Sequence, residues 1–379
     1  MNYNKSIFYS RPTWVEINQT VLKNNILNIS KYLSKKTKIC AIIKSNAYGH
    51  GLEEIGSIVS SSKTVKYLGV TAIEEAVVLR ERGIKLPILL FGNVFPYKNI
   101  KEIVHYKITP TVSSVSLLRE FEKYCMKNNT QVKFHLKIDT GMGRIGILPH
   151  SIDKFIEEMK NSRNLCLEGV YTHFSSAFED RRYTKQQMQL FFDSLKKINS
   201  AGIKQRIIHL ANSAAMLLYK EVHCDMVRPG LILYGLKPFS DTEKYIKVSP
   251  VLSLKSRIVF LKTLPKGKSI SYGNTFITKR KTKVATVPVG YADGILRKMS
   301  NVGKVLVGGK FCNILGRVTM DMIMVDVTDI NKVSVGDEVV LIGFQGKNFI
   351  SVEDIAQWCQ TINYEITTLL SYRIPRIVV

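Results

Sequence analysis

From Thr20 to about Leu236, short β-branched runs alternate with amphipathic stretches, and this rhythm limits the possible fold more than any other feature. An amphipathic stretch such as SIDKFIEEMK, which begins at Ser151, follows each run but the last. About eight runs are strand candidates, namely KICAIIK, YLGVTA, PILLFG, KITPTV, VKFHLKI, LEGVYTH, RIIHLA and DMVRPGLILYG. The competing doubly wound sheet usually carries a glycine-rich first turn, and GxGxxG is missing after the first run. The rhythm therefore predicts a closed (β/α)8 TIM barrel.

The pattern changes beyond Lys247, where β-rich runs follow one another with little helix between them. One short helix is expected at SVEDIAQWCQ, with Ser351 as the N-cap and Asp354 in the first turn. We predict an α/β chain of two domains, a barrel over residues 1–243 and a mainly β domain over residues 244–379. The first residues are candidates for pairing with the β domain. A length of 379 residues agrees with two domains.

Composition narrows the function classes. The net charge is +25, but the basic residues are scattered and lack the aromatic interleaving of a strand-binding surface. We therefore expect no nucleic-acid partner. The six cysteines form no CxxC pair, which predicts reduced, mostly buried thiols. No apolar signal region opens the chain and no stretch approaches the length of a membrane helix, so we expect a cytoplasmic protein without a membrane partner.

The strongest local motif is AIIKSNAYGHG, which spans Ala41 to Gly51. Lys44 ends an apolar strand, and active-site groups of a barrel collect where its strands end. A partly desolvated amine there has a lowered pKa and can form a Schiff base. A lone lysine in this position would usually be a solvated surface residue, but the polar loop with Tyr48 and two glycines favours a site.

A second motif, KIDTGMGRIGI, spans Lys137 to Ile147 after the fifth run. Its three glycines free the backbone to wrap a small ligand. Arg144 offers a planar fork that suits a carboxylate. From the residues alone, Lys137 is an ordinary lysine that keeps its amine in water.

These two motifs occur in order with THF, ANSAA, RPGLILYG, SYGNTF, GYADG, TMD and INYE, and together they resemble the alanine racemase family from about Arg11 to Arg376. The resemblance implies that Lys44 holds pyridoxal 5'-phosphate as an internal aldimine and that Tyr48 reaches the phosphate. It also implies that Arg144 contacts the phenolic oxygen of the cofactor and the substrate side. Lys137 would then be carbamylated and would hold this arginine. No metal site is expected.

The resemblance assigns further barrel residues. Arg228 would donate to the pyridine nitrogen, and because a guanidinium is not an acid near neutral pH, that nitrogen stays unprotonated. This weakens the cofactor as an electron sink and favours simple proton return. Support around the ring is implied for two histidines, His173 and His209. The implied phosphate cradle consists of Ser213 and the backbone N–H groups of Gly230 and Leu231, with Asn212 on the same rim.

Turning over a stereocentre requires an acid and a base on opposite faces, so Lys44 needs a counterpart. The resemblance implies that Tyr272, in SYGNTF, is this second base and comes from the neighbouring subunit of a homodimer with shared active sites. A phenol is a poor base at neutral pH unless cations lower its pKa, and His173 and Arg228 are the candidates.

The β domain supplies further implied contacts. Met320 and Asp321 match a motif that closes over the substrate carboxylate, chiefly through backbone groups, although Thr319 stands where the family often has cysteine. Tyr364 matches a phosphate or entrance tyrosine, and Tyr291 matches an entrance residue.

The expected function is interconversion of L-alanine and D-alanine, with D-alanine used for peptidoglycan. A racemase for serine or basic amino acids stays open, although bulky phenols at the entrance favour a small substrate. A barrel-type decarboxylase would need an acidic partner for the ring nitrogen, where this sequence has Arg228. A cofactor-binding protein without turnover would lack a second base, and Tyr272 argues against it.

Overall fold

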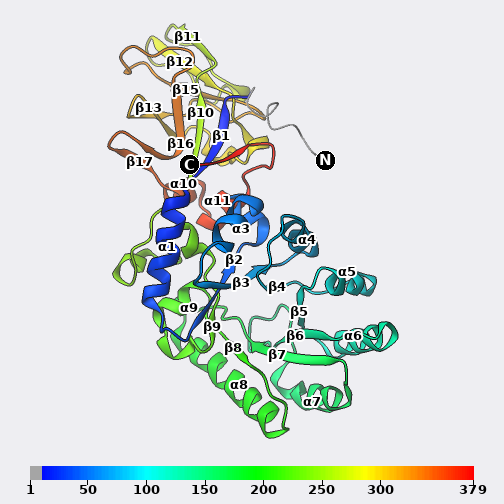
Figure 1. Ribbon diagram of the computed structural model, residues 1–379. Helices are drawn as coiled ribbons and strands as arrows, with labels where there is room; N and C mark the ends of the chain where they lie inside the picture. The colour runs from blue at the N-terminus through cyan, green and yellow to red at the C-terminus, as the bar shows by residue number, and fades with distance from the viewer. Residues whose placement is uncertain (1–10) are drawn as a thin grey trace. The chain divides into compact units, whose positions relative to one another are not determined.

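The computed structural model describes residues 11–379, and the chain folds as two compact units (Figure 1). One unit contains residues 22–47 and 55–248, and we call it the barrel unit. The other contains the described residues up to 21, residues 48–54 and residues 249–379, and we call it the β unit. Most of the N-terminal segment that we used to argue against a signal region lies outside the described residues.

The barrel unit is built on an eight-stranded parallel sheet. Its strands, in sheet order from one edge to the other, are β8 (Ile207–His209), β7 (Leu165–Tyr171), β6 (Val132–Lys137), β5 (Thr109–Val112), β4 (Ile88–Leu90), β3 (Val65–Val70), β2 (Lys38–Ile42) and β9 (Met226–Val227). Backbone N–H groups that flank β9 donate to the opposite edge, Asp225 to Ile208 O at 3.1 Å and Arg228 to Ala211 O at 2.9 Å. The sheet thus closes on itself, and the predicted barrel is confirmed.

Helices flank the outer side of this sheet, as α4 to α8 show in Figure 1. The helices of the barrel are α1 (Gln19–Tyr32), α2 (Lys44–Tyr48), α3 (Leu52–Ser60), α4 (Ile73–Glu81), α5 (Ile100–His105), α6 (Val115–Asn128), α7 (Ile152–Asn161), α8 (Arg181–Ser200) and α9 (Ser213–Leu218). Side-chain caps begin two of the long ones, since Ser114 accepts from Leu117 N and Asp180 accepts from Tyr183 N. Because helices cover the sheet, residues such as Leu68 and Leu136 are fully buried.

The eighth predicted strand is shorter than the run DMVRPGLILYG suggested. Only β9, Met226–Val227, is a strand, and Leu231–Tyr234 forms the 3-10 turn η5. Pro229 has no N–H to give to a sheet, and Gly230 takes φ −118° and ψ −90°, outside the strand region. The apolar residues after them are buried in η5 rather than in the sheet.

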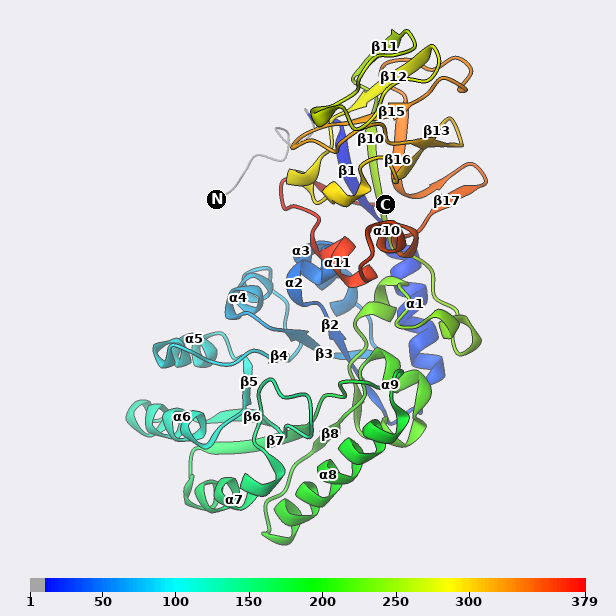
Figure 2. The same ribbon diagram turned by 180° about the vertical axis from the view of Figure 1, so that it is seen from behind.

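The β unit contains a seven-stranded sheet and a three-stranded sheet. The larger sheet contains β14 (Lys310–Asn313), β13 (Lys304–Val307), β16 (Glu338–Gln345), β10 (Leu252–Arg257), β1 (Thr13–Ile17) and β18 (Arg376–Val378), with β17 (Asn348–Ile350) paired to β16. The smaller sheet contains β11 (Phe260–Leu264), β12 (Thr282–Val287) and β15 (Ile323–Asp326). Figure 2 shows β1, β10 and β16 side by side. β1 pairs with β10 and β18, so the beginning of the described chain is part of this unit.

Two α-helices complete the β unit, α10 (Val352–Cys359) and α11 (Asn363–Thr368). The predicted cap of α10 is confirmed, because Ser351 Oγ accepts from Asp354 N at 2.9 Å and the Asp354 carboxylate accepts from Ser351 N at 2.8 Å. The six cysteines are free thiols and four of them are buried. Among residues 11–379, no helix has both the length and the apolar character needed to span a bilayer.

Candidate active site

Lys44 lies where β2 ends and begins α2, at the carboxyl end of a barrel strand. The four residues that follow it are all left-handed, with φ between 52° and 55° from Ser45 to Tyr48. L-residues avoid this region, so the turn is strained. Burial, followed by the positive charge of Arg144, lowers the pKa of Lys44, while Glu75 opposes the shift. Lys44 therefore has the character of an amine nucleophile.

The loop after β6 is folded around Asp139, whose Oδ1 accepts from the N–H groups of Gly141, Met142 and Gly143 at 2.9 to 3.1 Å. Lys137 O accepts from Ile147 N at 2.9 Å, which closes the loop and leaves Arg144 exposed at its tip. The Lys137 side chain is only 2% exposed. Burial, with added repulsion from Arg144 and Arg228, lowers the pKa of Lys137 to about 8.

Arg228 follows β9 directly, and its guanidinium is buried among neutral acceptors. Nη1 donates to His209 Nδ1 at 3.0 Å and to His209 O at 2.8 Å. Nη2 donates to Thr172 O at 2.8 Å and to Leu210 O at 2.9 Å, and it lies 3.4 Å from His173 Nδ1. The structure thus brings Arg228, His173 and His209 together, as expected.

Both histidines are neutral near pH 7. Burial, reinforced by the positive charge of Arg228, lowers the pKa of His173 and of His209 well below the usual value. The expectation that His173 supplies a cation is therefore wrong. Burial lowers the pKa of Arg228 only to about 10, so Arg228 keeps its charge.

The rim after β8 and β9 joins the residues expected around a phosphate. Asn212 caps α9, since its Oδ1 accepts from Ala215 N at 3.0 Å. Ser213 Oγ accepts from Gly230 N at 3.0 Å, and Leu231 begins η5 immediately afterwards. The expected cradle residues therefore lie together, and in this structure the Gly230 N–H is bonded to Ser213.

In the β unit, Tyr48 and Tyr364 lie together with ring centroids 6.0 Å apart. Burial raises the pKa of Tyr48, and Tyr364 adds to the rise, so Tyr48 is a hydrogen-bond donor near neutral pH. Thr367 O lies where a Cβ on Gly49 would stand, so α11 packs directly on the turn that carries Tyr48.

Tyr272 begins the turn η7, Tyr272–Asn274, and is 71% exposed in the single chain. Left-handed backbone at Ser271 and Gly273, with φ 65° and 72°, flanks it on both sides. Ser271 Oγ donates to Arg317 O at 2.6 Å and anchors the turn. The turn therefore holds the phenol out from the surface of the β unit.

Two further loops of the β unit support each other. Tyr291 N donates to Thr319 O and Ala292 N donates to Met320 O, both at 3.0 Å. The Asp321 carboxylate accepts from Arg373 at 2.7 Å. The side chain of Asp321 is thus engaged by an arginine, whereas Met320 is exposed.

Sequence reasoning missed several residues that surround Arg228. Tyr171 stacks on His209 at 4.7 Å, and the guanidinium carbon of Arg228 lies 5.3 Å from the Tyr171 ring centroid. His135 lies 2.8 Å from His209. Strand alternation could have indicated His135, because it stands two residues before Lys137 and shares its side of β6.

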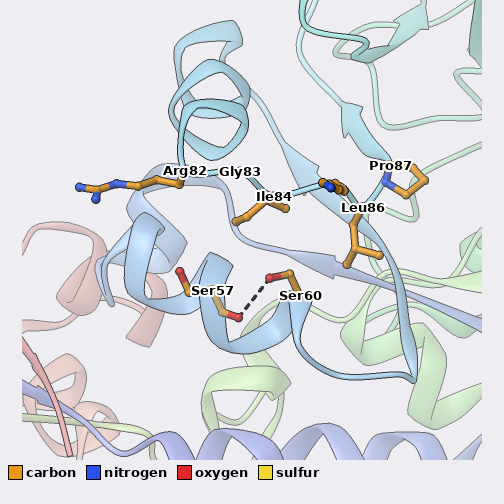
Figure 3. A pocket seen from close by; sticks show the side chains of 8 residues that line it. Ser57, Ser60, Arg82, Gly83, Ile84, Leu86 and Pro87 are labelled. Carbon is orange, nitrogen blue, oxygen red and sulfur yellow. Dashed lines mark hydrogen bonds between the residues drawn. The ribbon is translucent and has the colours of Figure 1, made fainter.

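A surface hollow lies between α3 and the loop before β4 (Figure 3). Ser57, Ser60 and Arg82 are among the residues that line it, and Ser60 Oγ donates to Ser57 O at 3.1 Å. None of the predicted site residues lines this hollow.

Comparison with known proteins agrees with this arrangement. Residues 17–238 match the family model described as "Alanine racemase, N-terminal domain", and residues 251–378 match "Alanine racemase, C-terminal domain". A curated alanine racemase of Halothermothrix orenii is 45% identical over 98% of both chains. "Alanine racemase 1" of Caldanaerobacter subterraneus is 44% identical over 97% of this chain and 95% of that protein.

Solved structures agree as well. Alanine racemase of Clostridium difficile superposes with a TM-score of 0.92 and 38% identity over 97% of this chain and 96% of the other. Alanine racemase of Bacillus anthracis with bound L-Ala-P gives a TM-score of 0.92 and 37% identity over 97% of this chain and 95% of the other.

A parallel barrel with a lysine of lowered pKa at a strand end, joined in one chain to a β-rich unit, defines a two-domain barrel protein whose candidate site carries an amine nucleophile. The matches over both units and the identity over nearly the full length show that the chain belongs to the alanine racemase family.

Proposed function

We propose that this chain binds pyridoxal 5'-phosphate and interconverts L-alanine and D-alanine, and that the D-alanine supplies peptidoglycan. The observation that carries the proposal is the convergence, in one barrel, of the lowered pKa of Lys44 with the buried cation of Arg228. The names of the curated relatives and the L-Ala-P bound by the Bacillus anthracis protein support alanine as the substrate.

The residues fit this cofactor. Lys44 is an amine that can bind an aldehyde, and Lys44, Lys137, Arg144 and Arg228 supply positive charge for a phosphorylated ligand. The carboxylate of Asp139 is already engaged by its own loop. The phosphate would be held by Tyr48 and Tyr364 and by the rim residues, which are Asn212, Ser213, Gly230 and Leu231. His173 and His209 would support the ring.

When bound, the cofactor stabilises the negative charge that develops at Cα after proton loss. We propose that Lys44 Nζ moves a proton on one face of Cα and that the hydroxyl of Tyr272 of the partner subunit does so on the other. Arg228 would donate to the ring nitrogen and leave it unprotonated, because a guanidinium does not give up its proton near neutral pH. An unprotonated ring nitrogen makes the cofactor a weaker electron sink, which favours simple return of the proton to Cα.

Substrate placement would depend on Arg144 and on the backbone around Met320 and Asp321. Since the Asp321 side chain is paired with Arg373, a contact from this loop to a carboxylate would come from backbone N–H groups. Carbamylation of Lys137 would turn a buried amine into a carboxylate that pairs with Arg144. Tyr291 and Tyr364 would narrow the entrance and favour a small side chain. We also propose that the barrel domain ends near residue 243.

A racemisation assay on a panel of L-amino acids, with and without added pyridoxal phosphate, tests the function. We expect turnover of alanine that depends on the cofactor. Lys44→Ala should abolish both the absorbance of the lysine-bound cofactor and the activity. Tyr272→Phe should retain the cofactor and lose at least about 100-fold in kcat, the usual contribution of a proton-transfer group.

Full activity in Tyr272→Phe would contradict the two-base scheme. Preferential turnover of serine or of a basic amino acid would show that this amino acid, and not alanine, is the main substrate. Cofactor binding without any turnover would show that the chain is a cofactor-binding protein and not a racemase.

A further inference from the structure

A line of polar side chains extends from Arg228 through the interior of the barrel. His209 Nδ1 faces Arg228 at 3.0 Å, and His209 Nε2 lies 2.8 Å from His135 Nδ1. His135 Nε2 in turn lies 3.5 Å from Glu168 Oε2, a contact between a ring N–H position and a carboxylate that falls short of hydrogen-bond geometry. Both imidazole rings are fully buried. The line therefore runs from a buried guanidinium to a carboxylate at the other end.

Two features of β7 make room for this line. A Cβ on Gly169 would lie 2.6 Å from His135 Cε1 and 2.9 Å from Ile207 O, so the imidazole occupies the place of a side chain. Phe134 pairs with Leu167 whereas His135 pairs with Gly169, which leaves Glu168 as the extra residue of a β-bulge. A bulge re-aims the side chain of its extra residue, and here the Glu168 side chain reaches His135.

The geometry fixes the proton on each ring. Arginine has no acceptor, so His209 Nδ1 must accept from Arg228 and the His209 proton must be on Nε2. That proton is donated to His135 Nδ1, which leaves the His135 proton on Nε2, facing Glu168. Each neutral ring is thus polarised in the same sense, with the carboxylate at one end and the cation at the other.

In the part of the chain that the structure describes, the hydrogen-bond partners of Arg228 are all neutral groups. Within residues 11–379 its bonded acceptors are carbonyl oxygens and ring nitrogens, and it forms no ion pair with a carboxylate. The contact with His135 lowers the pKa of Glu168, so this end of the line is charged near pH 7. Burial, followed by the charge of Glu168, raises the pKa of Tyr67 of β3, and the positive charges of Lys133 and Lys38 favour the ionised form of Glu168.

We propose that Glu168 is a positioning residue, which acts through His135 and His209 to orient the Arg228 guanidinium and to offset part of its buried charge. This inference rests on the proposed role of Arg228 toward the ring nitrogen. Because two histidines separate Glu168 from Arg228, the carboxylate of Glu168 would offset the positive charge of Arg228 without placing an acid beside the ring nitrogen of the cofactor.

The tautomers can be measured in the wild-type, full-length chain by nitrogen NMR of the imidazoles before any cofactor is added. We expect His135 and His209 both to be neutral and protonated on Nε2 at pH 7 to pH 8. A proton on Nδ1 of His209 overturns the proposal. This readout does not depend on activity or on any substitution.

Glu168→Gln removes the charge and keeps the shape. In the holoenzyme we expect kcat for alanine to fall about 10-fold, as for other groups that orient a ligand from behind, with KM changed less than about twofold. Glu158→Gln is the matched control, because Glu158 pairs with Arg119 on the outer helices. We expect its kcat to equal that of the wild type.

His135→Phe breaks the line in its middle and serves as the second variant if Glu168→Gln fails to fold. The double variant should lose no more in kcat than the worse single variant, since both changes interrupt one line. Additive losses, or an unchanged kcat in Glu168→Gln, overturn the inference while wild-type racemisation is intact. A wild type that binds no cofactor or racemises nothing instead refutes the proposed function.

Discussion

At the scale of single residues, the barrel gathers four cationic side chains, Lys44, Lys137, Arg144 and Arg228. The positive charge of Arg144 lowers the pKa of both lysines. Lys137 is the most confined amine, being 2% exposed with a pKa of about 8. A neutral amine adds to CO2, so this environment favours the carbamylation that the family resemblance implies.

Lys137 should make stability depend on pH in a definite direction. Its pKa falls from 10.5 to about 8 on folding, so below pH 8 the folded chain must keep a charge in a buried site. Between pH 8 and 10.5 the unfolded state binds the extra proton, and stability rises with pH. Lys137→Met should therefore be more stable than the wild type by up to about 3 kcal/mol below pH 8. The difference should vanish above pH 10.5.

Chemical unfolding of both chains in CO2-free buffer, from pH 7 to pH 11, measures this difference. Intact mass checks that the lysine is unmodified. A constant difference across this range would show that Lys137 is not buried as a charge. In bicarbonate, a wild type that gains both the mass of CO2 and stability relative to Lys137→Met would support carbamylation.

At the scale of elements, the left-handed turn of α2 sets the direction in which Lys44 and Tyr48 leave β2. Each left-handed L-residue costs about 1–2 kcal/mol, so Ser45, Asn46, Ala47 and Tyr48 together store several. Ala47 N donates to Ile43 O at 2.9 Å, and Asn46 N donates to Glu75 at 3.3 Å. Hydrogen bonds of this kind hold the turn in its strained conformation.

Gly49 should be the most sensitive position of this element. Gly49→Ala would place a Cβ 1.7 Å from Thr367 O at φ 83°, so the turn or α11 must move. Gly83→Ala is the matched control, with φ 79° and no atom within 4 Å. We expect the control to lose about 1 kcal/mol from backbone strain and Gly49→Ala to lose roughly 3 kcal/mol or more. Equal shifts in the urea midpoints would refute the packing argument.

The elements that could be predicted from the sequence are those that depend on residues close together in the chain. The strand runs and the Ser351 cap were readable, because strand periodicity and capping involve neighbours in sequence. The end of β9 was not, since a buried 3-10 turn and a strand share the apolar residues of LILYG. Glu168 was not predictable either, because a bulge depends on pairing with β6 and leaves no motif in the sequence. The charge state of His173 was misjudged, since it depends in part on Arg228, which lies 55 residues further along the chain.

At the scale of the whole molecule, the proposed two-base chemistry uses two groups that the chain carries on different units. Lys44 belongs to the barrel unit and Tyr272 to the β unit, where its phenol is 71% exposed. An exposed tyrosine held by an anchored, left-handed turn is well placed for delivery to another chain. The closed symmetry usual for homodimers would then give each dimer two equivalent sites, with Lys44 from one chain and Tyr272 from the other.

Shared sites predict that two inactive variants complement each other. In a mixed dimer of Lys44→Ala and Tyr272→Phe, one site carries both substitutions and the other carries neither. Random pairing makes about half of the dimers mixed, with one complete site of two, so activity should return to about a quarter of the wild type. The measurement is alanine racemisation, with added pyridoxal 5'-phosphate, after the two variants are co-expressed and purified together. Lys44→Ala paired with the double variant is the control and should stay inactive, because every site then lacks Lys44. If Tyr272 served its own chain, each site of the mixed dimer would lack one base, and no activity would return.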